Sequence, residues 1–107
     1  MGVIIVGAEH EPWMVARWAF RGYLEHVLAE VSRDKELTFA IEEALALDGL
    51  HLPLLDPAVV RRLMPTLVRV AEEVVRGERQ VQANGLILRG SSQDQFRQAV
   101  AELREIL

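Results

Sequence analysis

The strongest local signals in this sequence lie in its last part, residues 79–107. Asn84-Gly85, a dipeptide that tight hairpin turns prefer, separates two short runs rich in apolar residues. A two-residue loop at this point brings four apolar side chains onto one face of the hairpin: Val81, Ala83, Leu86 and Leu88. A lone hairpin is only marginally stable in water, so this face must be covered by earlier parts of the chain.

An amphipathic helix is expected directly after the hairpin, over residues 91–107. Ser91 or Ser92 can cap it, and Asp94 or Gln95 can close a capping box. The apolar stripe at helical spacing consists of Phe96, Ala99, Val100, Leu103 and Leu107. The hairpin and this helix therefore indicate how the domain closes its core, and they point to no site.

Composition favours one small domain, residues 1–107, with enough apolar side chains to build a core. Half of the residues are hydrophobic (50%), and part of that surplus is expected at an interface with another copy or another protein. The chain has no cysteine, which excludes disulfides, a thiol nucleophile and cysteine-ligated metals. The apolar run at residues 2–6 is too short for a signal peptide or a membrane span. We expect a cytoplasmic protein without membrane contact.

Residues 2–8 predict a strand, and residues 12–31 predict a helix with Pro12 in its first turn. The main stripe of this helix is Ala16, Phe20, Tyr23, Leu24, Val27, Leu28 and Val31. Met14 and Trp18 fall on roughly the opposite side of the same predicted helix. Because a single core needs only one apolar face, the second face is a candidate for an interface.

Residues 35–47 fit two structures. Leu37, Ala40, Ile41, Ala44 and Leu45 form a helical stripe, with Gly49 as the C-terminal cap. Read as a strand, the same segment turns at Asp48-Gly49 into residues 50–54. The good helix formers in the segment favour the helix narrowly.

Asp56-Pro57 predicts a helix start, an N-cap followed by proline at the first helical position. The helix is expected to reach about Arg76, and Pro65 within it predicts a kink or two abutting helices. The residues expected to be buried are Val60, Leu63, Met64, Leu67, Val70, Ala71 and Val74. The fold class that results is α+β: a mostly helical small domain, with a short sheet made of the N-terminal strand and the C-terminal hairpin packed on three to four helices.

Charged residues divide unevenly along the chain, whose net charge is -4. Residues 1–56 hold ten acidic and four basic side chains, whereas residues 57–107 hold six acidic and eight basic ones. Nucleic-acid binding through this second half is one alternative function. Intervening glutamates and the lack of aromatic side chains between Arg61 and Arg89 favour an ordinary salt-bridged surface instead. The arginines concerned are Arg61, Arg62, Arg69, Arg76, Arg79 and Arg89.

Glu9-His10-Glu11 is the best candidate for small-molecule chemistry, because a histidine beside carboxylates can serve as a general base or a metal ligand. Adjacent residues cannot complete a metal site, and acidic residues before a helix are also explained by the helix dipole. His26 and Glu30 lie one helical turn apart, which more often makes a surface contact than a ligand pair. No cofactor motif is present, so no metal or cofactor is expected.

Trp13, Met14 and Trp18 are the residues that we expect at an interaction surface, because tryptophan and methionine are enriched in the buried centres of interfaces. The sequence predicts a non-catalytic protein-interaction or regulatory module that forms a homodimer and resembles an antitoxin, an immunity protein or an adaptor in size and charge only. The alternatives are the nucleic-acid-associated factor and a small enzyme or metal site at Glu9-His10-Glu11.

Overall fold

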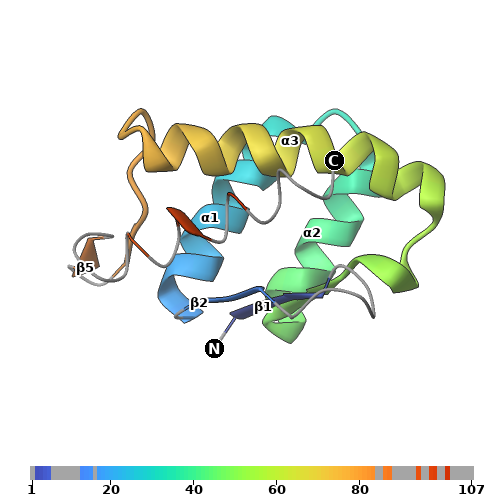
Figure 1. Cartoon of the computed structure of the whole chain (residues 1–107). Helices are drawn as coiled ribbons and strands as arrows, with labels where there is room; N and C mark the ends of the chain where they lie inside the picture. The colour runs from blue at the N-terminus through green and yellow to red at the C-terminus, as the bar shows by residue number, and fades with distance from the viewer. Residues whose placement is uncertain are drawn as a thin grey trace.

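The computed structural model describes residues 2–5, 13–15, 17–83, 86–87, 94, 97–98 and 101. Three helices, α1 (Arg17–Glu30), α2 (Lys35–Leu47) and α3 (Pro57–Val75), make up most of this part. Figure 1 shows α3 lying across one end of α1 and α2, with short strands at their other end. The predicted, mostly helical character is confirmed for these residues. None of the helices described has both the length and the apolar character needed to cross a membrane.

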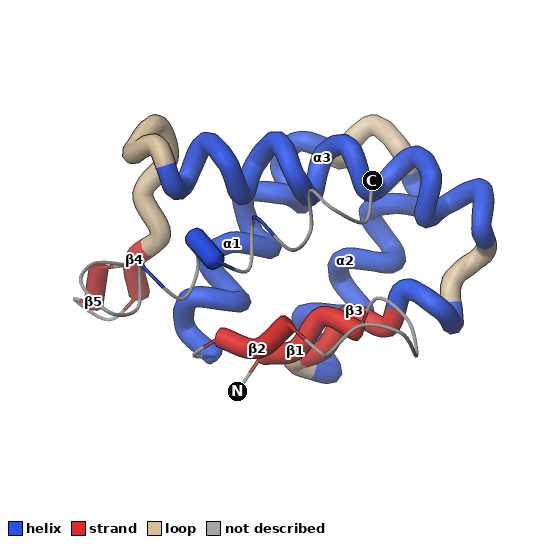
Figure 2. The backbone as a smooth tube through the Cα atoms, in the orientation of Figure 1, coloured by secondary structure: helices blue, strands red, loops and turns tan. Residues whose placement is uncertain are grey.

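The strands β1 (Gly2–Ile5), β2 (Trp13–Val15) and β3 (Gly49–His51) form a small mixed sheet in the order β2-β1-β3 (Figure 2). The central strand β1 is antiparallel to β2 and parallel to β3. Ile4 in this strand is completely buried, as befits the central strand of the sheet.

The predicted sheet of the N-terminal strand with the C-terminal hairpin is wrong. Among the described residues, β4 (Gln82–Ala83) and β5 (Leu86–Ile87) pair only with each other. The physical reason is that both hydrogen-bonding edges of β1 are already occupied by β2 and β3. The pairing of Ala83 with Leu86 matches the register of a two-residue loop. The turn itself, Leu88 and the apolar stripe expected beyond residue 91 lie outside the described residues.

The first helix begins at Arg17, five residues later than predicted. Residues 13–15 instead form the strand β2, because an extended segment with tryptophan and valine suits a sheet edge and can complete β1. The apolar stripe predicted for the first helix lies in the described core, except that Leu28 is only partly buried and Ala16 is not described. The buried members are Phe20, Tyr23, Leu24, Val27 and, just after the helix, Val31.

Residues 35–47 form a helix, which confirms the favoured alternative and excludes the strand. The Asp34 carboxylate caps α2 by accepting hydrogen bonds from the backbone N–H groups of Glu36 and Leu37. At the other end, Asp48 is the left-handed residue, with φ of 53°. The predicted cap at Gly49 is therefore displaced by one residue, because aspartate tolerates this conformation and Gly49 begins β3.

The helix α3 starts as predicted, with the Asp56 carboxylate accepting a hydrogen bond of 2.8 Å from the N–H of Ala58. It continues through Pro65 as one helix of 19 residues, so the expectation of two abutting helices is wrong. Pro65 is exposed, which lets water reach backbone groups that the proline leaves unpaired. The short 3-10 helix η1 (Leu52–Leu54) connects β3 to the start of α3. The buried side of α3 consists of Val59, Leu63, Met64, Leu67, Val68, Val70, Ala71 and Val74, and Val60 is only partly buried.

Candidate functional site

The three residues predicted for an interaction surface do not share a helical face. Trp13 and Met14 belong to the strand β2, and only Trp18 belongs to α1. Trp18 is partly buried and packs against the hydrophobic core. The reason given for this surface, a second apolar face on one helix, is therefore wrong, although the surface itself stays a prediction.

The predicted histidine sites receive no support from the described residues. Glu9-His10-Glu11 lies outside them, and within them no group of three or more side chains is arranged to hold a metal ion. His26 Nε2 donates a hydrogen bond to the backbone carbonyl of Gln80, with 3.1 Å between the two atoms. Glu30 instead accepts hydrogen bonds from Arg69 and Arg79. His26 and Glu30 therefore have separate partners, in place of the expected surface contact with each other.

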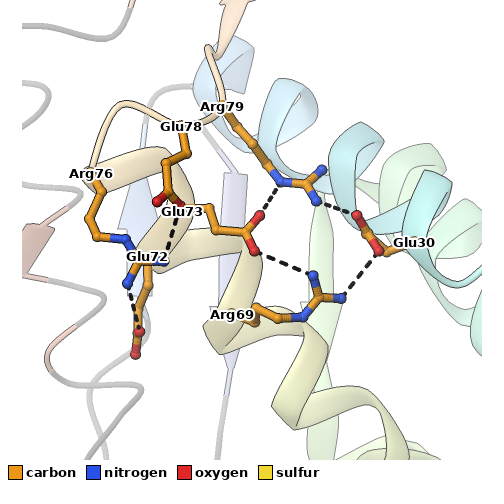
Figure 3. Close-up of polar contacts among 7 residues, drawn as sticks. All are labelled: Glu30, Arg69, Glu72, Glu73, Arg76, Glu78 and Arg79. Atoms are coloured by element: carbon orange, nitrogen blue, oxygen red, sulfur yellow. Dashed lines mark hydrogen bonds and ion pairs between the residues drawn. The ribbon is translucent and has the colours of Figure 1, made fainter.

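Two of the arginines in the second half join two glutamates in a closed ring of alternating charges (Figure 3). Arg69 donates to Glu30 over 3.2 Å and to Glu73 over 3.4 Å. Arg79 closes the ring with hydrogen bonds to the same two carboxylates. We call this the arginine–glutamate ring. It connects the end of α1 to α3 and to the segment after α3.

The ring changes the proton affinity of its carboxylates. The hydrogen bond from Arg79, followed by smaller contributions that include Arg69, lowers the pKa of Glu30 below its ordinary value. The hydrogen bond from Arg79 is also the largest cause of the lowered pKa of Glu73. The same contacts, first with Glu73 and then with Glu30, raise the pKa of Arg79.

We expect Arg79→Gln to make the protein's stability less dependent on acidic pH. A lowered pKa in the folded state gives stability that is present above the unfolded value, about 4.3 for glutamate, and that is lost as the pH falls. The difference in unfolding free energy between wild type and Arg79→Gln should therefore be largest near neutral pH and narrow below about pH 4. Urea denaturation across this range measures it. Arg76→Gln, outside the ring, is the control, and parallel pH profiles for wild type and Arg79→Gln would contradict the assignment.

Other arginines are also paired, as the salt-bridged interpretation predicts. Arg76 lies 3.8 Å from Glu72, which is one helical turn earlier, and 3.0 Å from Glu78. Arg62 bridges Asp34 and Glu36 at the start of α2, at 3.2 Å from each. Carboxylates thus accompany Arg62, Arg69, Arg76 and Arg79, four of the six arginines that a nucleic-acid surface would need. Arg89 lies outside the described residues.

A different surface carries the large exposed hydrophobic side chains of the described residues. Phe39, Leu47 and Leu54 are 67%, 70% and 81% exposed. The first two lie on the outer side of α2, and the third ends η1. Such side chains are unremarkable when scattered singly, so their meaning depends on whether they form one surface.

Phe39, Leu47 and Leu54 line two hollows of the surface. One, of about 260 Å³, lies between α2 and the segment from β3 to η1 and is lined in part by Leu47 and Leu54. The other, of about 330 Å³, lies between α2 and the start of α3 and is lined in part by Phe39. Ala40, Glu43 and Leu55 line both hollows. The two hollows therefore adjoin along α2, and we refer to them together as the groove. The groove and the side chains of Phe39, Leu47 and Leu54 make up what we call the α2–η1 face.

Sequence reasoning did not find this face, although one sign of it was present. Phe39 and Leu47 are eight residues apart, lie off the buried stripe of α2, and have Glu43 between them at helical spacing. The same reasoning applied to α2 as to Met14 and Trp18 would have identified this pair. No sequence pattern, however, places Leu54 beside Leu47, because that depends on how the chain turns after α2.

Comparison of the chain with protein families, with curated proteins and with solved structures finds no match.

Proposed function

We propose that this protein is a non-catalytic protein-interaction module that binds its partner through the α2–η1 face. The observation that carries the proposal is that three large exposed apolar side chains line two adjoining hollows. Burying apolar surface of this kind is the main favourable term in most protein association. Grooves with apolar walls are also a recurring way to bind an amphipathic segment of another protein.

We also propose the class of protein and its location in the cell. A small acidic protein that neutralises or recruits another macromolecule in the cytoplasm, in the manner of an antitoxin, an immunity protein or an adaptor, would need such a face. The segment with Trp13, Met14 and Trp18 is proposed as a separate surface for homodimer formation, since β2 is an edge strand in the described sheet. The Asn84-Gly85 turn and a C-terminal helix complete the proposed fold.

Replacing Phe39 and Leu54 together by serine is expected to abolish partner capture while leaving the fold intact. A hot-spot residue at the centre of an interface costs about 2 kcal/mol or more when it is truncated, so affinity should fall at least roughly 30-fold if even one of the two side chains is such a residue. Both side chains are mostly exposed, and the free energy of unfolding should change by less than about 1 kcal/mol. The measurement is co-purification with the tagged protein from cells that produce it, with unfolding monitored in parallel.

Two comparison variants make this result interpretable. Ala29→Ser changes an exposed position of α1 that lines neither hollow, and it should retain capture. Trp18→Ala tests the surface predicted from the sequence. Undiminished capture by the Phe39→Ser, Leu54→Ser protein would contradict the proposed function.

A further inference from the structure

We infer that the partner segment bound at the α2–η1 face is a cationic amphipathic helix, an inference that rests on the proposed function. Three observations support this partner: the charge of the segment that forms the face, the position of Glu43 in the groove, and the length of α2. The charge of the segment also bears on the competing occupant, a second copy of this chain.

The segment that builds the face is strongly acidic. Residues 34–56 contain six carboxylates and one basic side chain, Lys35. Asp34 and Glu36 are paired with Arg62, and Asp48 is paired with Arg21. Glu42 and Glu43 are exposed, and among the described residues no arginine or lysine forms an ion pair with either. Lys35 lines the hollow at the start of α3, so it offsets one of the two free glutamates, Glu42 and Glu43. The net negative charge that remains on the outer side of α2 attracts a basic partner.

Glu43 holds the central position, because it lines both hollows. A partner that covers the groove removes water from this carboxylate, and an unpaired charge in such a place is costly. A guanidinium from the partner compensates that cost with two charge-assisted hydrogen bonds. An apolar partner without a basic side chain at this point would instead leave Glu43 buried and unpaired.

A second copy of this chain fits the face less well. Two copies related by a twofold axis would bring the same acidic segment to both sides of the interface. Like charges brought together across an interface cost several kcal/mol and exclude wrong partners. The homodimer proposed above therefore uses a different surface.

The length of the groove suits a helix. The helix α2 has 13 residues, which corresponds to about 20 Å. Phe39 and Leu47 are about 12 Å apart along the helix axis, a little more than two turns. A bound helix with apolar residues at positions i, i+3, i+4 and i+7 covers this distance and presents basic residues along its edges.

The test uses two synthetic helical peptides of about four turns, both with leucine at the i, i+3, i+4 and i+7 positions. One peptide carries arginine and the other glutamate at the flanking positions. Their binding to the full chain is measured by fluorescence anisotropy at a fixed, near-physiological salt concentration. We expect the arginine peptide to bind and the glutamate peptide not to bind. Glu43→Gln should weaken binding about tenfold, while Glu42→Gln, on the same helix but lining neither hollow, should change it less than about twofold.

The outcomes separate the inference from the proposed function. Equal binding of both peptides, no binding of the arginine peptide, or equal effects of Glu43→Gln and Glu42→Gln would overturn the cationic partner. A dimer in light scattering that the Phe39→Ser, Leu54→Ser protein loses would also overturn it, because the occupant would then be a second copy. In each of these cases the α2–η1 face can still be an interaction surface. That proposal fails only if the double variant captures its partner as well as wild type does.

Discussion

Replacing Leu67 by alanine is expected to lower the free energy of unfolding by about 2–5 kcal/mol. Leu67 is completely buried in α3 and belongs to the cluster that α1, α2 and α3 build together. Removing its branched end leaves a cavity that tightly packed neighbours fill only in part. Urea denaturation at neutral pH, followed by tryptophan fluorescence or circular dichroism, measures the loss.

The matched control is a leucine-to-alanine substitution at an exposed position of a helix. Leu47 is also a helical leucine, but 70% of it is exposed, so Leu47→Ala should change the unfolding free energy by less than about 0.5 kcal/mol. A cost for Leu47→Ala similar to that for Leu67→Ala would mean that the α2–η1 face is covered within the chain itself. The pair of variants therefore tests the core and the candidate site in one experiment.

The elements that the sequence predicted best are those whose causes lie close together in the chain. The N-cap and first-turn proline at Asp56-Pro57 and the apolar stripe of α3 are local patterns, and the structure agrees with them. The helix at residues 35–47 was less certain, because its apolar residues fit both periods. The good helix formers in this segment favoured the helix. Capping by Asp34 adds a local reason for the helix to begin at Lys35.

The small sheet was predicted poorly because strand pairing is not local. The strand β1 pairs Ile4 with Trp13 on one side and with Leu50 on the other. Nothing in the run at residues 2–6 distinguishes these partners from the C-terminal hairpin. Pro12 also favoured an early helix start, whereas the pairing of residues 13–15 with β1 places that start at Arg17.

The candidate site and the arginine–glutamate ring were also hard to predict, because they depend on contacts between residues far apart in the sequence. Glu30 and Arg79 are 49 positions apart, and only the packing of α1 against α3 brings them together. The pair Glu72 and Arg76, one helical turn apart, was predictable because the helix alone sets its geometry. The exposed Phe39 was visible as an apolar residue off the buried stripe of α2. That Phe39 and Leu54 belong to the same face depends on the path of the chain through η1, which the sequence pattern does not predict.

Tyr23→Phe is expected to lower the free energy of unfolding by about 1–3 kcal/mol at neutral pH. The Tyr23 side chain is completely buried, and its hydroxyl donates a hydrogen bond of 2.6 Å to the backbone carbonyl of Leu67. Phenylalanine keeps the ring and its packing against the core, so the change isolates the hydroxyl. Losing the donor removes this polar connection between α1 and α3 and leaves part of the hydrogen-bonding capacity of the carbonyl unused.

The same tyrosine makes stability sensitive to alkaline pH. Burial raises the pKa of Tyr23 in the folded protein far above its ordinary value of about 10. Because the folded pKa is raised, its contribution is fully present below about pH 10 and is lost as the pH rises towards the folded value. Wild type should therefore lose stability above about pH 10 more steeply than Tyr23→Phe does. Tyr23 is the only tyrosine, so tyrosinate absorbance should develop together with unfolding. Tyrosinate formation in the folded protein near pH 10, or equal alkaline slopes for both proteins, would show that this hydroxyl is not buried as described.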